Sequence, residues 1–387
     1  MVDRTAGALS VFNPTAAFLW LSLWDGPRSI GSLTAELLQV FPSAPAELAA
    51  DVAGMIADWR DRGWLQSGPD GLRILRSAAD SDGGGVAPPA PLLDPCSIEG
   101  CRPVWAIDRD LLGTSVRIEM AVAQAPLRAD FSTRIQALLA GLPAGAGPVR
   151  TRIACHVSDG AIHLACDGRR FATRDGAVAV GRLILWCLYA AYGEDDFIAS
   201  LHAAAVGRPD GMVLLPAASG AGKSTLAAYL VSQGWAYGGD DVVGLGRGAG
   251  ASDVVVLPFP TAISVKEGSL GLLERFFPGL RDRAEIRYDA KRARFQPVDP
   301  ARIVGRSADL RRPLALVFPR FVPEAAVDLT PLSTEEALSA ISADGIGLGD
   351  GLQRPDLHRL FSFMERIPKY ALRYSSLVEA AACLRAL

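Results

Sequence analysis

The first 76 residues alternate apolar and polar positions with the spacing of amphipathic helices. Asn13-Pro14 offers the capping side chain and first-turn proline that begin a helix, and Asp25-Gly26 ends it. Two further helices are expected where apolar positions recur three and four residues apart, in the sets Ile30, Leu33 and Leu37, and Leu48, Val52, Met55, Ile56 and Trp59. Apolar runs at 64–65 and 72–75 flank a turn sequence and predict a β-hairpin. Three helices and a hairpin predict a winged-helix-like α+β domain over residues 1–76.

The composition changes after this domain. Residues 78–95 (AADSDGGGVAPPAPLLDP) are rich in Gly, Pro and Asp, and we expect a linker over 77–100. Residues 101–200 alternate short apolar runs with turns, which predicts a β-rich subdomain that ends in a helix over 181–192. From 201 to 387 strand and helix signals alternate, so we expect an α/β domain there.

Bulk composition narrows the class of protein. The 387 residues carry a net charge of −3, which argues against a general nucleic-acid binder or a membrane-surface protein. The longest apolar stretch, 183–191, is too short to span a bilayer, and the start of the chain lacks a signal-peptide pattern, so we expect a cytoplasmic protein. The six cysteines show no CxxC spacing and are interpreted as reduced thiols rather than metal ligands.

A glycine-rich loop with phosphate-binding spacing lies at residues 217–224 (AASGAGKS). It follows an apolar strand at 212–215 and precedes a helix that closes near Gly234, which is the order in which loop amides and a helix N-terminus face a phosphate. Ala217 replaces the first glycine of the GxxxxGK[ST] pattern. We predict that the loop binds a nucleoside triphosphate through Ser219, Gly220, Ala221, Gly222, Lys223, Ser224 and Thr225. The alternative is a Gly/Ala turn that contains GKS by chance.

Two consecutive carboxylates, Asp240 and Asp241, follow the loop lysine by 17 and 18 residues. In phosphoryl transfer one carboxylate can hold Mg²⁺ while another accepts the proton of the attacking hydroxyl. His202 precedes the strand that leads into the glycine loop, and a hydrogen bond to a catalytic carboxylate would explain it. The alternatives are a turn with solvated acids and a structural histidine.

Lysine is rare in this chain, at four of 39 basic residues. Lys266, Arg287 and Lys291 are candidates for contacts with phosphates or with the acceptor, although each of them alone is better explained by a solvated surface. Lys369 and Arg373, which lie beside two tyrosines, are most simply structural.

Residues from about 200 onward resemble the HPr kinase/phosphorylase superfamily, and within it the related kinases that act outside sugar regulation. The resemblance rests on LHAAAV, ASGAGKSTLAAYL and GGDDVVGL in that order, and continues loosely through PFPTAISVKEGSL and RIPKYALRYSSLVEAAACL. It implies that Lys223 and Ser224 hold ATP and Mg²⁺, that Asp240 is the general base, that Asp241 lies on the metal side and that His202 is the partner of Asp240. The bifunctional signature region of the family has no clear counterpart here, so the resemblance leaves open whether reverse phosphorolysis occurs. Related kinases often assemble, so a homo-oligomer is an open alternative.

Residues 1–76 resemble the PqqD-like peptide-recognition domains of ribosomally made, modified peptides. VFNPTAAFLW, DGPRSIGSLTAELL and DVAGMIADWRDRGWL carry the match. The resemblance implies a leader peptide of a precursor as partner, bound as an added β-strand, and other peptide-modifying enzymes as further partners.

Three functions fit these observations. The first is a kinase that captures a precursor's leader peptide and phosphorylates a Ser or Thr of its core. The second is a nucleotide-sensing regulator with a DNA-binding winged helix, and the third is a non-catalytic nucleotide-binding chaperone. Residues 1–76 hold six basic and eight acidic side chains, whereas a DNA reader needs a basic excess, so the first function is preferred.

Overall fold

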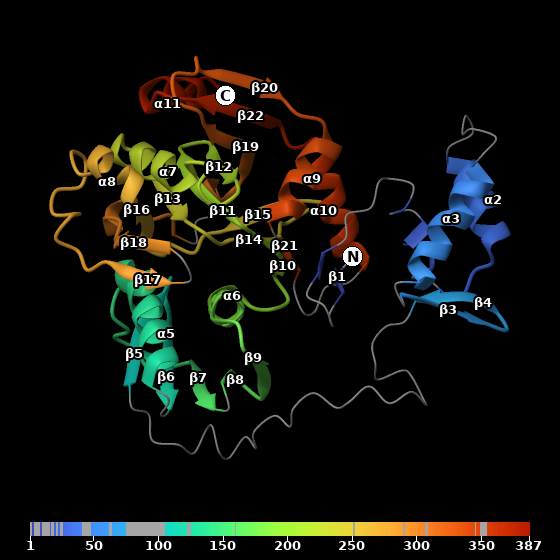
Figure 1. Ribbon diagram of the computed structural model, residues 1–387, viewed down its shortest axis with the longest axis horizontal. Helices are drawn as coiled ribbons and strands as arrows, with labels where there is room; N and C mark the ends of the chain where they lie inside the picture. The colour runs from blue at the N-terminus through green and yellow to red at the C-terminus, as the bar shows by residue number, and fades with distance from the viewer. Residues whose placement is uncertain are drawn as a thin grey trace. The chain divides into compact units, whose positions relative to one another are not determined.

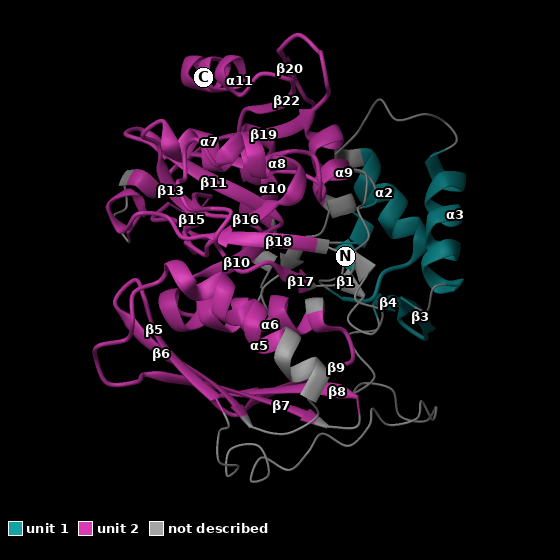
Figure 2. Cartoon of the chain, turned by 60° about the vertical axis from the view of Figure 1, so that its left-hand side comes forward, with its two compact units in different colours: residues 1–89 teal, residues 90–387 magenta. Residues whose placement is uncertain are grey.

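The computed structural model divides the chain into two compact units, residues 1–89 and 90–387 (Figure 2). The structure describes residues 2–3, 8–9, 16, 19–20, 22–23, 26–40, 48–61, 64–74, 105–121, 125–158, 160–250, 252–288, 291–305, 309–344, 346–348 and 354–387. The boundary between the units falls inside the stretch 77–100 that we predicted as a linker. The predicted linker, the helix start at Asn13-Pro14 and two of the cysteines, Cys96 and Cys101, lie outside the described residues.

Unit 1 contains the elements that the apolar pattern predicted. Helices α2 (Ile30–Val40) and α3 (Leu48–Asp61) precede strands β3 (Leu65–Gly68) and β4 (Gly71–Ile74), which form an antiparallel hairpin. Two short strands, β1 (Val2–Asp3) and β2 (Ala8–Leu9), pair with each other. The apolar sides of both helices pack with Ala16, Leu19, Trp20 and Leu23, the described apolar residues of the first predicted helix, and the rings of Trp20 and Trp59 meet edge to face at 5.2 Å.

The first part of unit 2 is a five-stranded sheet covered by two helices. Its strands run in the order β5 (Trp105–Leu111), β6 (Thr114–Ala121), β7 (Thr151–Ser158), β8 (Ala161–Cys166) and β9 (Arg169–Thr173). The strands predicted over 101–200 are therefore present, and the helix expected over 181–192 begins earlier, as α6 (Gly176–Tyr192). Helix α5 (Ala125–Leu138) was not predicted, although Leu127, Phe131, Ile135 and Leu138 recur with helical spacing in its sequence.

A six-stranded mixed sheet forms the centre of the second part of unit 2 (Figure 1). Its order is β13 (Ala236–Gly239), β11 (Ala203–Arg208), β12 (Gly211–Pro216), β19 (Pro313–Phe321), β22 (Lys369–Tyr374) and β20 (Asp328–Pro331). Alternate residues of β11 and β12 face opposite sides, as the period of a strand requires. One side packs against α7 (Lys223–Ser232) and α11 (Leu377–Ala386), and the other packs against a second sheet and two helices.

The second sheet and the remaining elements complete a mixed α/β unit. The second sheet is antiparallel, in the order β15 (Val254–Leu257), β14 (Val243–Arg247), β10 (Phe197–Leu201) and β21 (Ile346–Leu348). The helices that pack with it are α9 (Thr334–Asp344) and α10 (Arg354–Arg366). A three-stranded sheet has the order β16 (Ile263–Lys266), β18 (Lys291–Gln296) and β17 (Ile286–Tyr288). Helix α8 (Glu267–Leu273) follows β16 directly in the chain.

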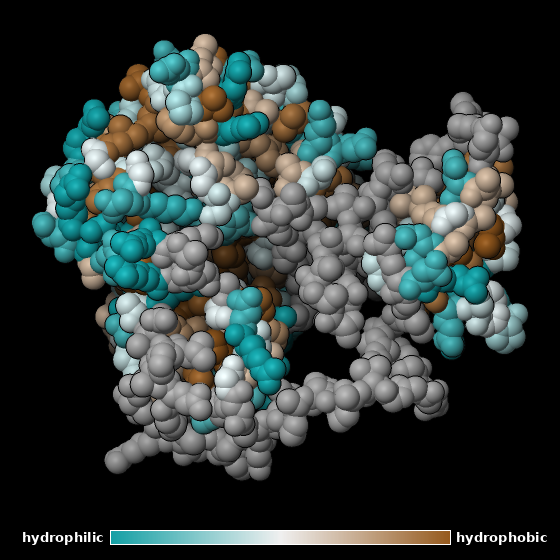
Figure 3. All heavy atoms as spheres, viewed as in Figure 1, coloured by the Kyte–Doolittle hydropathy of each residue, from teal (hydrophilic) through white to brown (hydrophobic). Residues whose placement is uncertain are grey.

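The surface and the thiols agree with a chain that packs its apolar residues inside. On the face drawn in Figure 3, hydrophilic side chains cover much of the described surface of unit 2, with apolar ones interspersed. Among the described helices none has both the length and the apolar content needed to cross a bilayer. The described cysteines, Cys155, Cys166, Cys187 and Cys383, are free thiols.

Candidate functional site

The strand order brings three separate sequence motifs to one edge of the six-stranded sheet. Strand β11 is antiparallel to both of its neighbours, and it pairs Ala203 with Pro216 of β12 and Ala205 with Gly239 of β13. The start of β11 therefore lies beside the ends of β12 and β13. His202, the glycine loop and the two carboxylates leave the sheet at these three points, so they meet although 38 residues separate His202 from Asp240.

The glycine loop turns sharply between β12 and α7. Gly220 and Gly222 both have a φ of 98°, in the left-handed region that favours glycine. A Cβ on Gly222 would lie 2.5 Å from the Tyr374 hydroxyl, whereas a Cβ on Gly220 would meet open space. Ala217, which replaces the expected glycine, is buried and has no left-handed φ, so its methyl group brings no backbone strain.

The ends of two other strands fix the loop from outside. The backbone N–H of Phe321, at the end of β19, donates to the carbonyl of Ala221 at 2.9 Å. The hydroxyl of Tyr374, at the end of β22, donates to the carbonyl of Gly222 at 3.2 Å. These two carbonyls consequently point toward the sheet.

Lys223, the first residue of α7, is buried and points toward the carboxylates. Its Nζ lies 3.3 Å from Asp241 Oδ1 and 3.9 Å from Asp240 Oδ1. It also lies 3.3 Å from His202 Nε2, while His202 Nδ1 lies 3.0 Å from the backbone oxygen of Asp241. These distances assign a neutral tautomer in which Nδ1–H donates to the carbonyl and Nε2 accepts from the ammonium. We expected Asp240 as the partner of His202, and these contacts instead join His202 to Asp241 and Lys223.

The two carboxylates have different surroundings. Asp240 is 2% exposed; its Oδ2 accepts from the backbone N–H of Ser264 at 3.3 Å, and its Oδ1 has no hydrogen-bond partner among the described residues. Burial, and next the charge of Asp241, raise the pKa of Asp240 to about 6. Lys223 opposes this shift, as does the Ser224 hydroxyl, which lies near the carboxylate but makes no hydrogen bond to Oδ1.

Asp241 is one third exposed and has a φ of 69°, which is uncommon for a residue other than glycine. Burial would raise the pKa of Asp241, but Lys223 and His202 outweigh it, and the pKa is lowered. Arg134, from α5 in the β-rich part of the unit, adds to the lowering. The carbonyl of Leu138, one turn further along α5, accepts from Ala262, and the neighbouring Thr261 hydroxyl donates to the carbonyl of Asp240 at 3.0 Å. Helix α5 is thus attached to the segment that holds the carboxylates.

The remaining predicted contacts differ in their distance from the loop. Lys266 Nζ donates to the Ser219 hydroxyl at 2.7 Å, so this lysine lies at the glycine loop. The Thr225 hydroxyl bonds that of Ser269 at 2.6 Å. Arg287 is exposed and pairs with Glu285 at 3.2 Å, and Lys291 begins β18 opposite Tyr288, with its side chain outside the described residues. The structure therefore ties Lys266 to the loop and shows no such contact for Arg287.

Lys369 is structural, as its sequence context indicated. Its ammonium is buried and donates to the carbonyls of Met364, Glu365 and Ile367 at the end of α10. Lysine at a helix C-terminus satisfies carbonyls that have no partner within the helix. These contacts explain why a lysine occupies position 369, and they do not involve the glycine loop.

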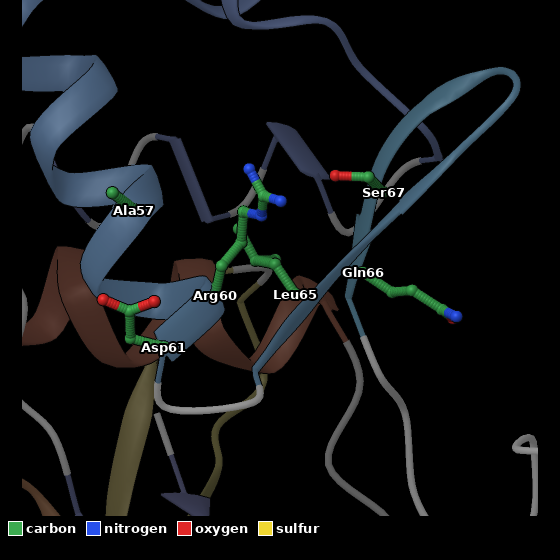
Figure 4. A pocket seen from close by; sticks show the side chains of 6 residues that line it. All are labelled: Ala57, Arg60, Asp61, Leu65, Gln66 and Ser67. Carbon is green, nitrogen blue, oxygen red and sulfur yellow. The ribbon is translucent and has the colours of Figure 1, made fainter.

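Unit 1 has a groove between α3 and the outer edge of the hairpin. It is lined by Ala57, Arg60 and Asp61 of α3 and by Leu65, Gln66 and Ser67 of β3. Figure 4 shows Arg60 extending from α3 between the helix and the hairpin. Within the described part of the unit, β4 is the strand paired with β3, so the other edge of β3 faces this groove.

The register of the hairpin fixes which backbone groups point into the groove. The N–H and the carbonyl of Leu72 bond to the backbone of Arg28, on the side of β4 away from β3. Leu72 and its opposite residue, Ser67, are therefore a pair without mutual hydrogen bonds. In such a pair both residues direct their N–H and carbonyl outward, so those of Ser67 face the groove.

Comparison with known proteins bears on unit 1. Residues 1–65 match the family model described as Coenzyme PQQ synthesis protein D (PqqD), which confirms the resemblance of the N-terminal domain. A search of curated proteins found no match to the chain. The family match ends at residue 65, so the function of residues 201–387 is inferred from the geometry of the glycine-loop site.

Proposed function

We propose that the chain is an ATP-dependent kinase that phosphorylates a Ser or Thr of a ribosomally made precursor peptide, whose leader is captured by unit 1. The observation that carries the proposal is the meeting of the glycine loop, the buried Lys223 and two carboxylates at one sheet edge. Positioning groups of this kind supply most of the catalysis in phosphoryl transfer, because little covalent chemistry falls to the protein.

The residues at the loop fit a nucleotide with Mg²⁺. The left-handed glycines free the loop amides to face an anion, and α7 adds the positive end of its dipole. Asp240 Oδ1, which has no hydrogen-bond partner in the described structure, and the nearby Ser224 hydroxyl are oxygen donors of the kind that Mg²⁺ prefers. Bound Mg²⁺ would neutralise charge on the β- and γ-phosphates. Lys223 would exchange Asp241 for phosphate oxygens, with His202 holding its ammonium at the site.

Two assignments of the carboxylates compete within this proposal. In the first, Asp240 is the general base and Asp241 lies on the metal side; a pKa of about 6 leaves Asp240 ionised at neutral pH yet basic enough to accept a proton. The greater exposure of Asp241 and the nearness of Ser224 to Asp240 favour the reverse. Asp240→Asn and Asp241→Asn separate the two: the variant of the base retains nucleotide and Mg²⁺ affinity and loses transfer by roughly 10²-fold or more.

For unit 1 we propose that the leader peptide adds a strand to the open edge of β3. An added strand needs an edge with outward N–H and carbonyl groups, and Ser67 supplies both in the groove beside α3. Ser67→Pro removes the outward N–H without removing a bond of the hairpin, and Ser67→Ala is its matched control. Labelled leader peptide should bind Ser67→Ala as it binds the parent chain, and Ser67→Pro at least tenfold more weakly, as measured by fluorescence polarisation.

The whole proposal is tested with a precursor peptide, to be sought as a short reading frame beside the gene. Lys223→Ala should remove ATP affinity in calorimetry and phosphoryl transfer in mass spectrometry, with leader binding unchanged. Deletion of residues 1–76 should leave ATP binding intact and lower modification of the full precursor, because tethering no longer raises the local concentration of the acceptor. Full turnover by Lys223→Ala would refute the kinase. Tight binding of unit 1 to duplex DNA and none to the leader would favour a regulator.

A further inference from the structure

The sheet order separates the two sides of the glycine loop. Strands β11 and β13 lie on one side of β12. Strand β11 begins just after His202, and β13 ends just before the two carboxylates. On the other side lie β19 and β22. Strand β19 is parallel to β12 and β22 is parallel to β19, so the carboxyl ends of both lie at the same edge of the sheet as the loop. Ligands of open α/β sheets bind at this edge, beyond the carboxyl ends of the strands.

Phe321 is the last residue of β19, and its side chain is 48% exposed. Its position relative to the loop is fixed: its N–H donates to the Ala221 carbonyl, and its Cβ would lie 3.2 Å from a Cβ on Gly222. The ring of Tyr374 packs edge to face against the Phe321 ring, with centroids 5.9 Å apart. A large apolar side chain is thus held open to solvent directly beside the proposed phosphate site.

We propose that the Phe321 ring is the platform on which the base of the nucleotide stacks, an inference that rests on the proposed nucleotide binding. A nucleoside triphosphate is a linear ligand whose γ-phosphate must point toward the acceptor, on the side of Asp240 and Asp241. With its phosphates on the loop, its nucleoside end leaves on the opposite side, toward the ends of β19 and β22. Phe321 is the exposed aromatic side chain at that place.

The chemistry of the platform sets its selectivity. A phenyl ring stacks on any base, and the contact grows with the area of the base, so purine nucleotides should bind more tightly than pyrimidine nucleotides. The ring carries no donor or acceptor, so this contact does not distinguish adenine from guanine. The same ring has no contact to offer a chain of phosphates without a base.

The test uses the full chain with ATP, CTP and inorganic tripolyphosphate in calorimetry, each with Mg²⁺. Phe321→Ala should weaken ATP binding by roughly tenfold to a hundredfold, CTP binding by less, and tripolyphosphate binding not at all. Phe321→Trp should retain ATP affinity, and Phe321→Leu, which keeps an apolar contact with Tyr374, should lose it as Phe321→Ala does. Phe361→Ala, at another exposed phenylalanine on α10, is the matched control and should bind all three ligands as the parent does.

The outcomes separate the inference from the proposed function. If Phe321→Ala binds ATP as tightly as the parent chain does, the stacking platform is overturned and the proposed nucleotide binding is not. Equal weakening of ATP and tripolyphosphate by Phe321→Ala also overturns it, because it would show that the substitution disturbs the loop. A parent chain that binds neither ATP nor tripolyphosphate overturns the proposed nucleotide binding, and the platform with it.

Discussion

Replacing Asp240 by Asn should stabilise unit 2 at neutral pH while it impairs the proposed transfer. The carboxylate is 2% exposed, one of its oxygens has no hydrogen-bond partner in the described structure, and the nearest ammonium is 3.9 Å away. Asparagine has the same shape and needs no charge compensation. Lys223 keeps Asp241 and His202 as partners in the variant, so the substitution leaves no new charge unpaired.

The size and sign of the effect follow from the pKa of Asp240. It rises from the ordinary 3.8 to about 6 in the folded chain, so the unfolded carboxyl ionises first as the pH increases. Stability from this group is therefore fully present below about pH 4 and is lost as the pH rises through about 6. Above that pH the loss reaches about 3 kcal/mol, at about 1.4 kcal/mol per pH unit. Asp240→Asn removes this pH dependence.

Thermal unfolding at pH 7.5 and pH 4.5 measures the prediction. At pH 7.5 Asp240→Asn should melt roughly 5 °C or more above the parent, and at pH 4.5, where only about a third of the loss has appeared, the difference should be correspondingly smaller. The matched control is Asp356→Asn, since Asp356 is also buried but accepts two hydrogen bonds of 2.6 Å from Arg247. That variant should lose about 2 kcal/mol or more at pH 7.5, because it breaks a compensated pair. A parent more stable than Asp240→Asn at pH 7.5 would refute the reasoning.

Three further predictions concern the loop, the carboxylates and α10. Gly222→Ala should reduce ATP affinity at least tenfold, because its Cβ would lie 2.5 Å from a tyrosine hydroxyl; Gly220→Ala has the same φ but open space, and should lose less in the same calorimetry. Arg134→Gln removes a charge that lowers the pKa of Asp241, so the pKa of this carboxyl, measured by NMR titration, should rise. Lys369→Met leaves three carbonyls at the end of α10 without their donor and should cost about 2–4 kcal/mol in denaturant unfolding.

Local sequence signals predicted the parts of the site that lie close together in the chain. The strand at 212–215, the glycine loop and the helix after it follow from a contiguous pattern, and the structure places β12 and α7 there. Arg134 and Phe321 carry no such signal. Arg134 belongs to a helix more than 100 residues from Asp241, and Phe321 reaches the loop because β19 lies next to β12 in the sheet. Strand order reveals Phe321 and the packing of α5 reveals Arg134, and neither is encoded in local periodicity.

The backbone of Asp241 explains how two consecutive carboxylates can face one lysine. In an extended strand neighbouring side chains point to opposite faces, so a regular Asp-Asp pair would present one carboxylate to Lys223 and turn the other away. Here both lie within 4 Å of Nζ, because β13 ends at Gly239 and the left-handed φ of Asp241, in the bend before β14, turns the second carboxylate back. A left-handed conformation costs a residue with a Cβ roughly 1–2 kcal/mol. The ion pair with Lys223 and the hydrogen bond from His202 to the Asp241 carbonyl offset that cost. His202 therefore supports the geometry of the carboxylate pair through the backbone, which a role as the side-chain partner of Asp240 would not have required.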